Sequence, residues 1–192
     1  MEAKYPVVLA SGSPRRKELL ARILESFEVL PSTFDESMVT AGPDVLAAEL
    51  AKAKAQDVFR HRPHSLVIGC DTIVVLDGKV LGKPCDERDA VEMLARLSGK
   101  RHCVVTGVFL IWPAGEFGFQ ETSAVTFRPL STKEIEIYVA SGEPMDKAGA
   151  YAIQGGANGF AMKIAGDFDN IVGLPVERLM KAMEEIRLDD QS

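Results

Sequence analysis

Residues 66–78 read Leu-Val-Ile-Gly-Cys-Asp-Thr-Ile-Val-Val-Leu-Asp-Gly, and this stretch decides the fold class. The apolar run Leu66–Gly69 predicts a buried strand that ends at Cys70-Asp71, with Thr72–Leu76 continuing extended. Asp77-Gly78 is typical of a type I′ hairpin turn, after which the chain returns antiparallel. The stretch therefore places an apolar strand and a hairpin inside a sheet.

The segments around this stretch supply further strands and helices. Strands are expected over Pro6–Ala10, Arg101–Trp112 and Phe117–Arg128. Helices are expected to begin at Pro14, near Pro43, after Asp86, after the capping box Ser131-Thr132-Lys133-Glu134 and at Pro175. We predict a mixed α/β fold in which a curved central mixed sheet is flanked by helices and two lobes form a cleft. Residues 1–192 are expected to form one domain.

The helix near Pro43 carries a short apolar face. Leu46, Leu50 and Ala53 fall on one side of it, whereas Lys52 and Lys54 fall on other sides. This spacing predicts that Leu46, Leu50 and Ala53 form the face that packs against the sheet, because a helix buries its apolar stripe.

Composition narrows the class of protein and its partners. Hydrophobic residues make up 46%, charged residues 26%, and the net charge is −6, which is typical of a globular protein without a nucleic-acid partner. The longest apolar runs are too short to span a bilayer, and the N-terminus lacks a signal pattern. Three cysteines without CxxC spacing indicate buried thiols. We therefore expect a cytoplasmic protein with no membrane partner.

Residues 11–16, Ser-Gly-Ser-Pro-Arg-Arg, form the first candidate binding segment. A loop of small residues leading into a helix exposes backbone N–H groups at the positive end of the helix dipole, which suits an anion. Arginine adds forked donors that match phosphate oxygens. The alternative is an ordinary capped helix with two solvated arginines. The candidate ligands are Ser11, Gly12, Ser13, Arg15 and Arg16.

Four charged residues elsewhere are candidates for metal or phosphate binding. Asp71 follows an apolar strand, where a carboxylate can hold a metal ion or a water; the alternative is a turn-forming aspartate. Glu36 is a second candidate carboxylate. Lys54 and Lys83 are candidate phosphate ligands, although lysines of this kind are usually solvated.

Common nucleotide and hydrolase motifs are absent from the sequence. It contains no GxxxxGK[ST] loop, no GxGxxG after a strand and no GxSxG elbow. His61, His64 and His102 form no HExxH pattern, so zinc is not expected. The chemistry has to be inferred from a combination of motifs.

Short motifs occur in order along nearly the whole chain. They are Leu9–Arg16, Leu50-Ala51, Lys54-Ala55, Gly69–Val74, Gly82-Lys83-Pro84, Leu97-Ser98-Gly99, Thr106-Gly107-Val108, Asp146–Tyr151, Ile153-Gln154-Gly155 and Val172–Pro175. Together they resemble the Maf family. The resemblance implies a fold similar to that of the inosine triphosphate pyrophosphatases, and hydrolysis of nucleoside triphosphates to the monophosphate and pyrophosphate.

The resemblance also implies roles for individual residues. Asp71 is implied as the general base and, with Glu36, as a ligand of a divalent metal, Mg²⁺ or Mn²⁺. Arg16, Lys54 and Lys83 are implied to complement the phosphates. The implied partner is a small-molecule nucleoside triphosphate, and because the family often dimerises, a homodimer is an open prediction.

Three positions imply a preference for the base. Arg15, Thr72 and Gln154 resemble the branch that hydrolyses dTTP and UTP, whereas a branch linked to 7-methyl-GTP tends to carry Trp, Gln and Glu there. The Gln154 amide offers one acceptor and two donors to a uracil or thymine edge. A glutamine amide can also turn over, so CTP and modified pyrimidine nucleotides are expected as weaker substrates. The alternative is that Gln154 only braces a glycine-rich loop.

Two other functions stay open as alternatives. One is a pyrophosphatase for deaminated or methylated purine nucleotides, which a similar architecture would support. The other is a regulator of septum formation and cell division, with or without catalysis, because the Maf family has long been associated with that process. The set of charged residues favours catalysis over binding alone.

Overall fold

The computed structural model describes residues 4–189 of the chain. Its strands are β1 (Val7–Leu9), β2 (Glu28–Val29), β3 (Leu66–Leu76), β4 (Lys79–Leu81), β5 (Arg101–Trp112), β6 (Gly115–Phe127) and β7 (Ala161–Ala165). Its α-helices are α1 (Pro14–Ala21), α2 (Leu46–Phe59), α3 (Glu87–Leu97), α4 (Thr132–Ala140), α5 (Phe168–Val172) and α6 (Val176–Asp189). Short 3₁₀ helices are η1 (Glu36–Met38), η2 (Glu143–Asp146), η3 (Ala148–Ala150) and η4 (Asn158–Phe160). Residues 1–3, part of the N-terminus examined for a signal pattern, lie outside the described range.

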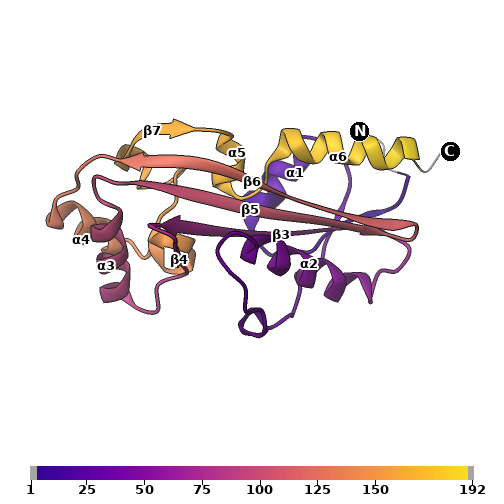
Figure 1. Cartoon of the computed structure of the whole chain (residues 1–192), viewed down its shortest axis with the longest axis horizontal. Helices are drawn as coiled ribbons and strands as arrows, with labels where there is room; N and C mark the ends of the chain where they lie inside the picture. The colour runs from indigo at the N-terminus through magenta and orange to yellow at the C-terminus, as the bar shows by residue number, and fades with distance from the viewer. Residues whose placement is uncertain (1–3, 190–192) are drawn as a thin grey trace. The chain divides into compact units, whose positions relative to one another are not determined.

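The strands form one mixed sheet with the order β2-β1-β3-β5-β6-β7, and β4 pairs with β3. β1 runs parallel to β2 and β3, whereas β4 is antiparallel to β3 and β7 to β6. Helices flank the strands (Figure 1), so the predicted mixed α/β class is confirmed. Between residues 4 and 189, no helix is both long and apolar enough to cross a membrane.

The chain divides into two compact units, each assembled from separated segments. Within the described residues, the first unit contains 4–71, 106–121 and 173–189, and the second contains 72–105 and 122–172. The predicted division into two lobes therefore has a counterpart in the structure. Because β3, β5 and β6 each contribute residues to both units, the division falls inside strands and not in linkers.

In the first unit, α2 packs against the sheet through alanine. Its buried residues include Ala47, Ala51 and Ala55, and glycines on the strands lie beneath them. A Cβ on Gly69 would come within 2.2 Å of the Ala51 carbonyl oxygen, and one on Gly107 within 2.2 Å of the Ala47 carbonyl oxygen. Helix and strands therefore approach more closely than any residue with a side chain at either glycine would permit.

This contact corrects the prediction for α2. The helix begins at Leu46 and not near Pro43, and its buried face is not the one predicted. Of the three residues expected to pack, only Leu50 is buried; Leu46 and Ala53 are partly exposed. The prediction followed the larger apolar side chains of the helix. The glycines on β3 and β5 instead bring the alanine face of α2 against the sheet.

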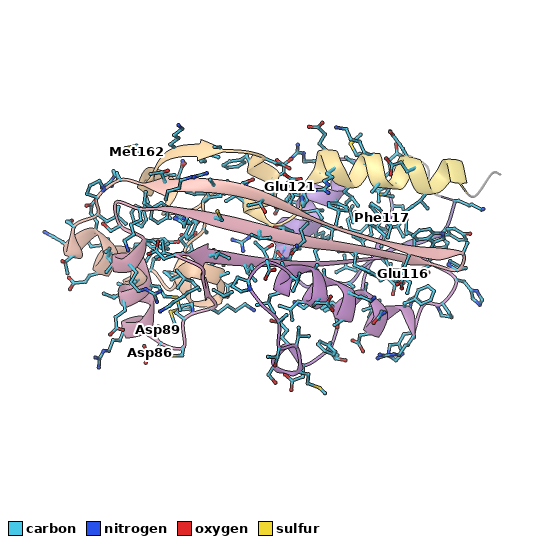
Figure 2. All side chains as sticks on the ribbon, in the orientation of Figure 1. Asp86, Asp89, Glu116, Phe117, Glu121 and Met162 are labelled. Carbon is cyan, nitrogen blue, oxygen red and sulfur yellow. The ribbon has the colours of Figure 1, made fainter. Side chains whose placement is uncertain are left out.

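Turn and cap signals were predicted well. Ser13 caps α1, Asp86 caps α3 and the Ser131 capping box starts α4. At the start of α3 (Figure 2), the Asp86 carboxylate accepts a hydrogen bond from the backbone N–H of Asp89 at 2.8 Å. Asp77 and Gly78 both have positive φ, 50° and 75°, as a type I′ turn requires. These motifs are local, so their outcome depends little on tertiary packing.

The second unit has an aromatic core. His102, Phe127 and Tyr151 pack edge to face, with ring centroids 4.9–5.5 Å apart. The Nε2 atom of His102 lies 2.9 Å from the Tyr151 hydroxyl, and only 2% of His102 is exposed. Burial lowers the pKa of this imidazole to about 4, so His102 is neutral at physiological pH and its role is structural.

Candidate functional site

Lys54 lies between two carboxylates in the first unit. Its Nζ is 2.5 Å from Oδ1 of Asp71 and 2.7 Å from Oε1 of Glu36. The Lys54 and Asp71 side chains are only 13% and 11% exposed, whereas Glu36 is 49% exposed. Two carboxylates and one ammonium leave a net charge of −1, partly shielded from water, and this suits a cation or a proton.

Strand β3 places Asp71 differently from the prediction. Asp71 was expected at the end of a strand that stops at Cys70-Asp71, but β3 continues without a break to Leu76. Asp71 is therefore in mid-strand, and it is buried with 8% of its surface exposed. The hydrophobic residues on both sides of it keep the strand extended through this polar position.

Helix α2 supplies Lys54, and the glycine contact sets its distance from Asp71. Gly69 is two residues before Asp71 on β3, and the alanines it meets, Ala51 and Ala55, flank Lys54 on the helix. The close approach of helix and strand therefore fixes both members of the ion pair in one packing contact.

The loop that carries Glu36 is held by a residue that the sequence did not single out. The Oδ2 atom of Asp57, also on α2, accepts hydrogen bonds from the Ser32 hydroxyl at 2.7 Å and from the Thr33 N–H at 3.0 Å. These bonds, the Ser32 hydroxyl first, lower the pKa of Asp57. An isolated aspartate in a helix carries no sequence signal for such a long-range contact. Asp57 links the Glu36 loop to the helix that carries Lys54.

The segment 11–16 forms a tightly bonded turn. The Ser11 hydroxyl oxygen accepts from the Ser13 N–H at 3.3 Å and from Nη1 of Arg16 at 3.2 Å, and the Ser13 hydroxyl accepts from the Arg16 N–H at 3.4 Å. Nε of Arg16 donates to the Gly173 carbonyl at 2.9 Å. Arg16 is thus held in place by its own loop and by the segment before α6.

The other two candidate ligands of this segment, Gly12 and Arg15, are more exposed to solvent than Ser11. Gly12 is exposed, and a Cβ there would meet only Pro31 at 3.5 Å, which is an ordinary contact. Arg15 is partly exposed on the first turn of α1. Glycine at position 12 is therefore not required by packing, which leaves its backbone accessible.

The remaining predicted residues, Thr72, Lys83 and Gln154, belong to the second unit. Thr72 follows Asp71 on β3 and is partly buried. Lys83 is exposed after β4, in a loop whose Gly82 carbonyl accepts from the Gly149 N–H at 3.0 Å. Gln154 is exposed in a turn between η3 and η4. The structure thus brings Ser11, Ser13, Arg16, Glu36, Lys54 and Asp71 into one unit and these three into the other.

Other potential sites are sparse in the described part of the chain. No group of three or more His, Cys, Asp or Glu side chains between residues 4 and 189 could hold a metal ion. Burial raises the pKa of the Cys70 thiol to about 11, so it stays protonated beside Asp71. A separate open depression in the first unit is lined by residues 4–8 and 24–28, and none of the predicted site residues lines it.

Comparison with solved structures places the fold. The structure of the Staphylococcus aureus Ham1 protein resembles this chain with a TM-score of 0.54 and 15% sequence identity, over 95% of this chain and 99% of that one. At this identity the likeness concerns the fold alone, a mixed sheet flanked by helices.

Sequence comparison gives the family. Residues 6–186 match the family described as Maf-like protein, and the chain belongs to that family. Similar curated proteins include the dTTP/UTP pyrophosphatase of Aquifex aeolicus, 44% identical over 95% of this chain and 96% of its own. That of Thermococcus gammatolerans is 47% identical over 93% and 95%. The resemblance stated from the motifs is confirmed.

Proposed function

We propose that this chain is a metal-dependent nucleoside triphosphate pyrophosphatase that hydrolyses dTTP and UTP to the monophosphate and pyrophosphate. The observation that carries the proposal is the Lys54 ammonium paired with the Asp71 and Glu36 carboxylates. Relatives 44–47% identical over almost the whole chain are named dTTP/UTP pyrophosphatases, which supports the substrate class.

In this proposal Asp71 is the general base. A water attacks the α-phosphorus, its proton passes to the Asp71 carboxylate, a P–O bond forms, and the bond to the β-phosphate breaks to release pyrophosphate. Lys54 is the hydrogen-bond donor to Asp71, and it holds that carboxylate in place to accept the proton. Most of the rate enhancement then comes from the positioning of the water and the substrate and from stabilisation of the charge that develops on the phosphate oxygens.

The residues present fit a hard divalent cation. Mg²⁺ is usually bound through one or two carboxylates together with substrate phosphates, and Asp71 and Glu36 supply those oxygens from one cluster. When bound, Mg²⁺ or Mn²⁺ would neutralise developing charge on the phosphate oxygens. Arg16, fixed by Ser11 and Gly173, and the backbone of residues 11–13 would bind phosphate oxygens. Lys83 would add a further positive charge.

Base recognition is assigned to Gln154 with Arg15 and Thr72. Gln154 is exposed and its amide can meet the N3–H and a carbonyl of uracil or thymine. Arg15 can donate to a second carbonyl. CTP is proposed as a weaker substrate because the amide can turn over. Three further predictions accompany this proposal: the chain functions as one domain, it is cytoplasmic, and it forms a homodimer.

The proposal is tested by the products and by Asp71→Asn. The purified protein with Mg²⁺ should release pyrophosphate and UMP from UTP, and EDTA should abolish this release. Asp71→Asn should lower kcat by about 10²–10³-fold or more, while Asp77→Asn, a matched control in the hairpin turn, should not. Diphosphate and orthophosphate as products, or near-normal turnover by Asp71→Asn, would contradict the mechanism.

A further inference from the structure

Two hydrogen bonds within the second unit hold the loop that contains Gln154. Two residues before Gln154, the Ala152 N–H donates to the Tyr138 hydroxyl at 3.0 Å. Two residues after it, the Gly156 N–H donates to Oε2 of Glu143 at 2.8 Å. Gln154 itself is exposed. The two bonds fix the backbone on both sides of the exposed amide.

The glycines after Gln154 lie close against this support. A Cβ on Gly155 would lie 1.9 Å from Oε1 of Glu143, and one on Gly156 would lie 3.0 Å from the Tyr138 ring. Gly155 therefore lies against Glu143, and Gly156 lies against both Tyr138 and Glu143. Neither position has a positive φ, so a side chain added there would be opposed by the neighbouring side chains and not by the backbone conformation.

The supporting residues are themselves well anchored. Tyr138 is buried on α4, and its ring packs edge to face on Phe160 at 5.2 Å. Glu143 starts η2, directly after Gly142, whose φ of 76° ends the preceding helix. The segment that leads into the loop contains Ala150 at φ 59°, an uncommon conformation that persists only where the surroundings impose it.

From these contacts we infer that Glu143 is a positioning residue for base selection, assisted by Tyr138. This role rests on the proposed function of Gln154. Glu143 acts through the loop: it holds the Gly155-Gly156 backbone so that Gln154 keeps one position beside a pyrimidine edge. A loop released from Glu143 would let the amide sample several orientations, and binding of the base would then weaken while discrimination between bases falls.

Three variants separate this role from a general structural one. Glu143→Ala removes the acceptor, Glu143→Gln keeps an amide oxygen for the Gly156 N–H, and Gly155→Ala displaces the carboxylate by the added methyl group. Glu136→Ala is the matched control, because Glu136 is an exposed glutamate on α4 in the same unit. The protein is used at full length.

The measurements are kcat and KM for UTP, dTTP, CTP and GTP with Mg²⁺, and amide hydrogen exchange at residues 152 and 156. Glu143→Ala and Gly155→Ala should each raise KM for UTP by about 2- to 10-fold, because the lost hydrogen bond is exposed to solvent. Their kcat should change little, their UTP/CTP ratio should move toward one, and residue 156 should exchange faster. Glu143→Gln should recover most of the wild-type selectivity, and Glu136→Ala should retain all of it.

The double variant Glu143→Ala/Gly155→Ala should be no worse than either single one, because both remove the same contact. Unchanged selectivity in Glu143→Ala, in an enzyme whose wild type hydrolyses UTP, would overturn the role of Glu143. An equal loss of kcat for every nucleotide would do the same, since it would show a structural defect only. A wild type without activity on UTP or dTTP would instead overturn the proposed function itself.

Discussion

At the residue scale, the proposed mechanism depends most on the ion pair between Lys54 and Asp71. Both side chains are nearly buried, 13% and 11% exposed, and their charges lie 2.5 Å apart. Removing one charge leaves the other shielded from water without its partner, and this is usually more costly than the loss of an exposed ion pair. Substitutions of the pair should therefore change the free energy of unfolding as well as the proposed activity.

The coupling can be measured in a double-mutant cycle. We expect Lys54→Met to lower the free energy of unfolding, and Asp71→Asn in the Lys54→Met background to recover part of that loss, with a coupling energy of about 0.5–3 kcal/mol. Urea denaturation of the four proteins gives this value. Lys52→Met is the control, because Lys52 lies on the same helix but is 40% exposed and 3.6 Å from its partner Glu116. Additive effects of the two substitutions would show that the pair is not coupled.

At the element scale, the contact of α2 with β3 and β5 determines where the site lies. The helix carries Lys54 and Asp57, and Asp57 in turn holds the loop of Glu36. One helix thus positions two of the three charged groups, while β3 positions the third. The separation of helix and sheet therefore sets the distance between Lys54 and Asp71 as well as the packing of the unit.

Gly69→Ala tests this dependence. The added methyl group would meet the Ala51 carbonyl oxygen at 2.2 Å, a backbone atom that can move only if α2 moves. We expect a destabilisation of about 1–3 kcal/mol and a lower kcat, because Lys54 shifts relative to Asp71. Thermal unfolding and UTP hydrolysis are the measurements. Gly159→Ala, where nothing lies within 4 Å of the new Cβ, should match the wild type; a normal kcat in Gly69→Ala would refute the link between this packing and the site.

The elements also show what a sequence can predict. The predictions of the helix caps and of the hairpin turn were correct because each depends on residues close in sequence. Ser13 and Asp86 bond to backbone N–H groups three residues on, and Asp77-Gly78 form the turn by their own conformation. The extended course of Thr72–Leu76 was predicted correctly, but the strand end at Cys70-Asp71 was wrong, because the residues around Asp71 carry β3 through this polar position. The contacts of Asp57 and Glu143 could not be foreseen, since they join residues 13 to 25 positions apart through folded geometry.

At the scale of the whole molecule, stability should depend on pH through His102. The pKa of His102 is about 4 in the folded protein, because burial disfavours the charged form, whereas its ordinary value is 6.5. The unfolded chain therefore binds more protons than the folded one between these values, and stability falls as the pH decreases from about 6.5 to about 4. The total loss attributable to His102 is about 3 kcal/mol.

Urea midpoints at pH 7 and pH 4.5 measure this loss. His102→Phe removes the titrating group while keeping a ring against Phe127, so its stability should change less between the two pH values than that of the wild type. His64→Phe is the control, because His64 is exposed. If His102→Phe kept the full acid sensitivity of the wild type, the effect would have to arise from other groups.

The interleaving of the two units has a consequence for protein synthesis. The first unit needs residues 173–189, which leave the ribosome roughly a hundred residues after 4–71, and the second unit has its whole sequence between them. Residues 4–71 therefore cannot complete the fold of the first unit until the second unit has been translated. Neither unit can be expressed as a contiguous fragment. A nascent chain stalled before residue 173 would lack the buried apolar residues of α6, such as Leu179 and Met183, and transiently exposed apolar surface of this kind favours aggregation.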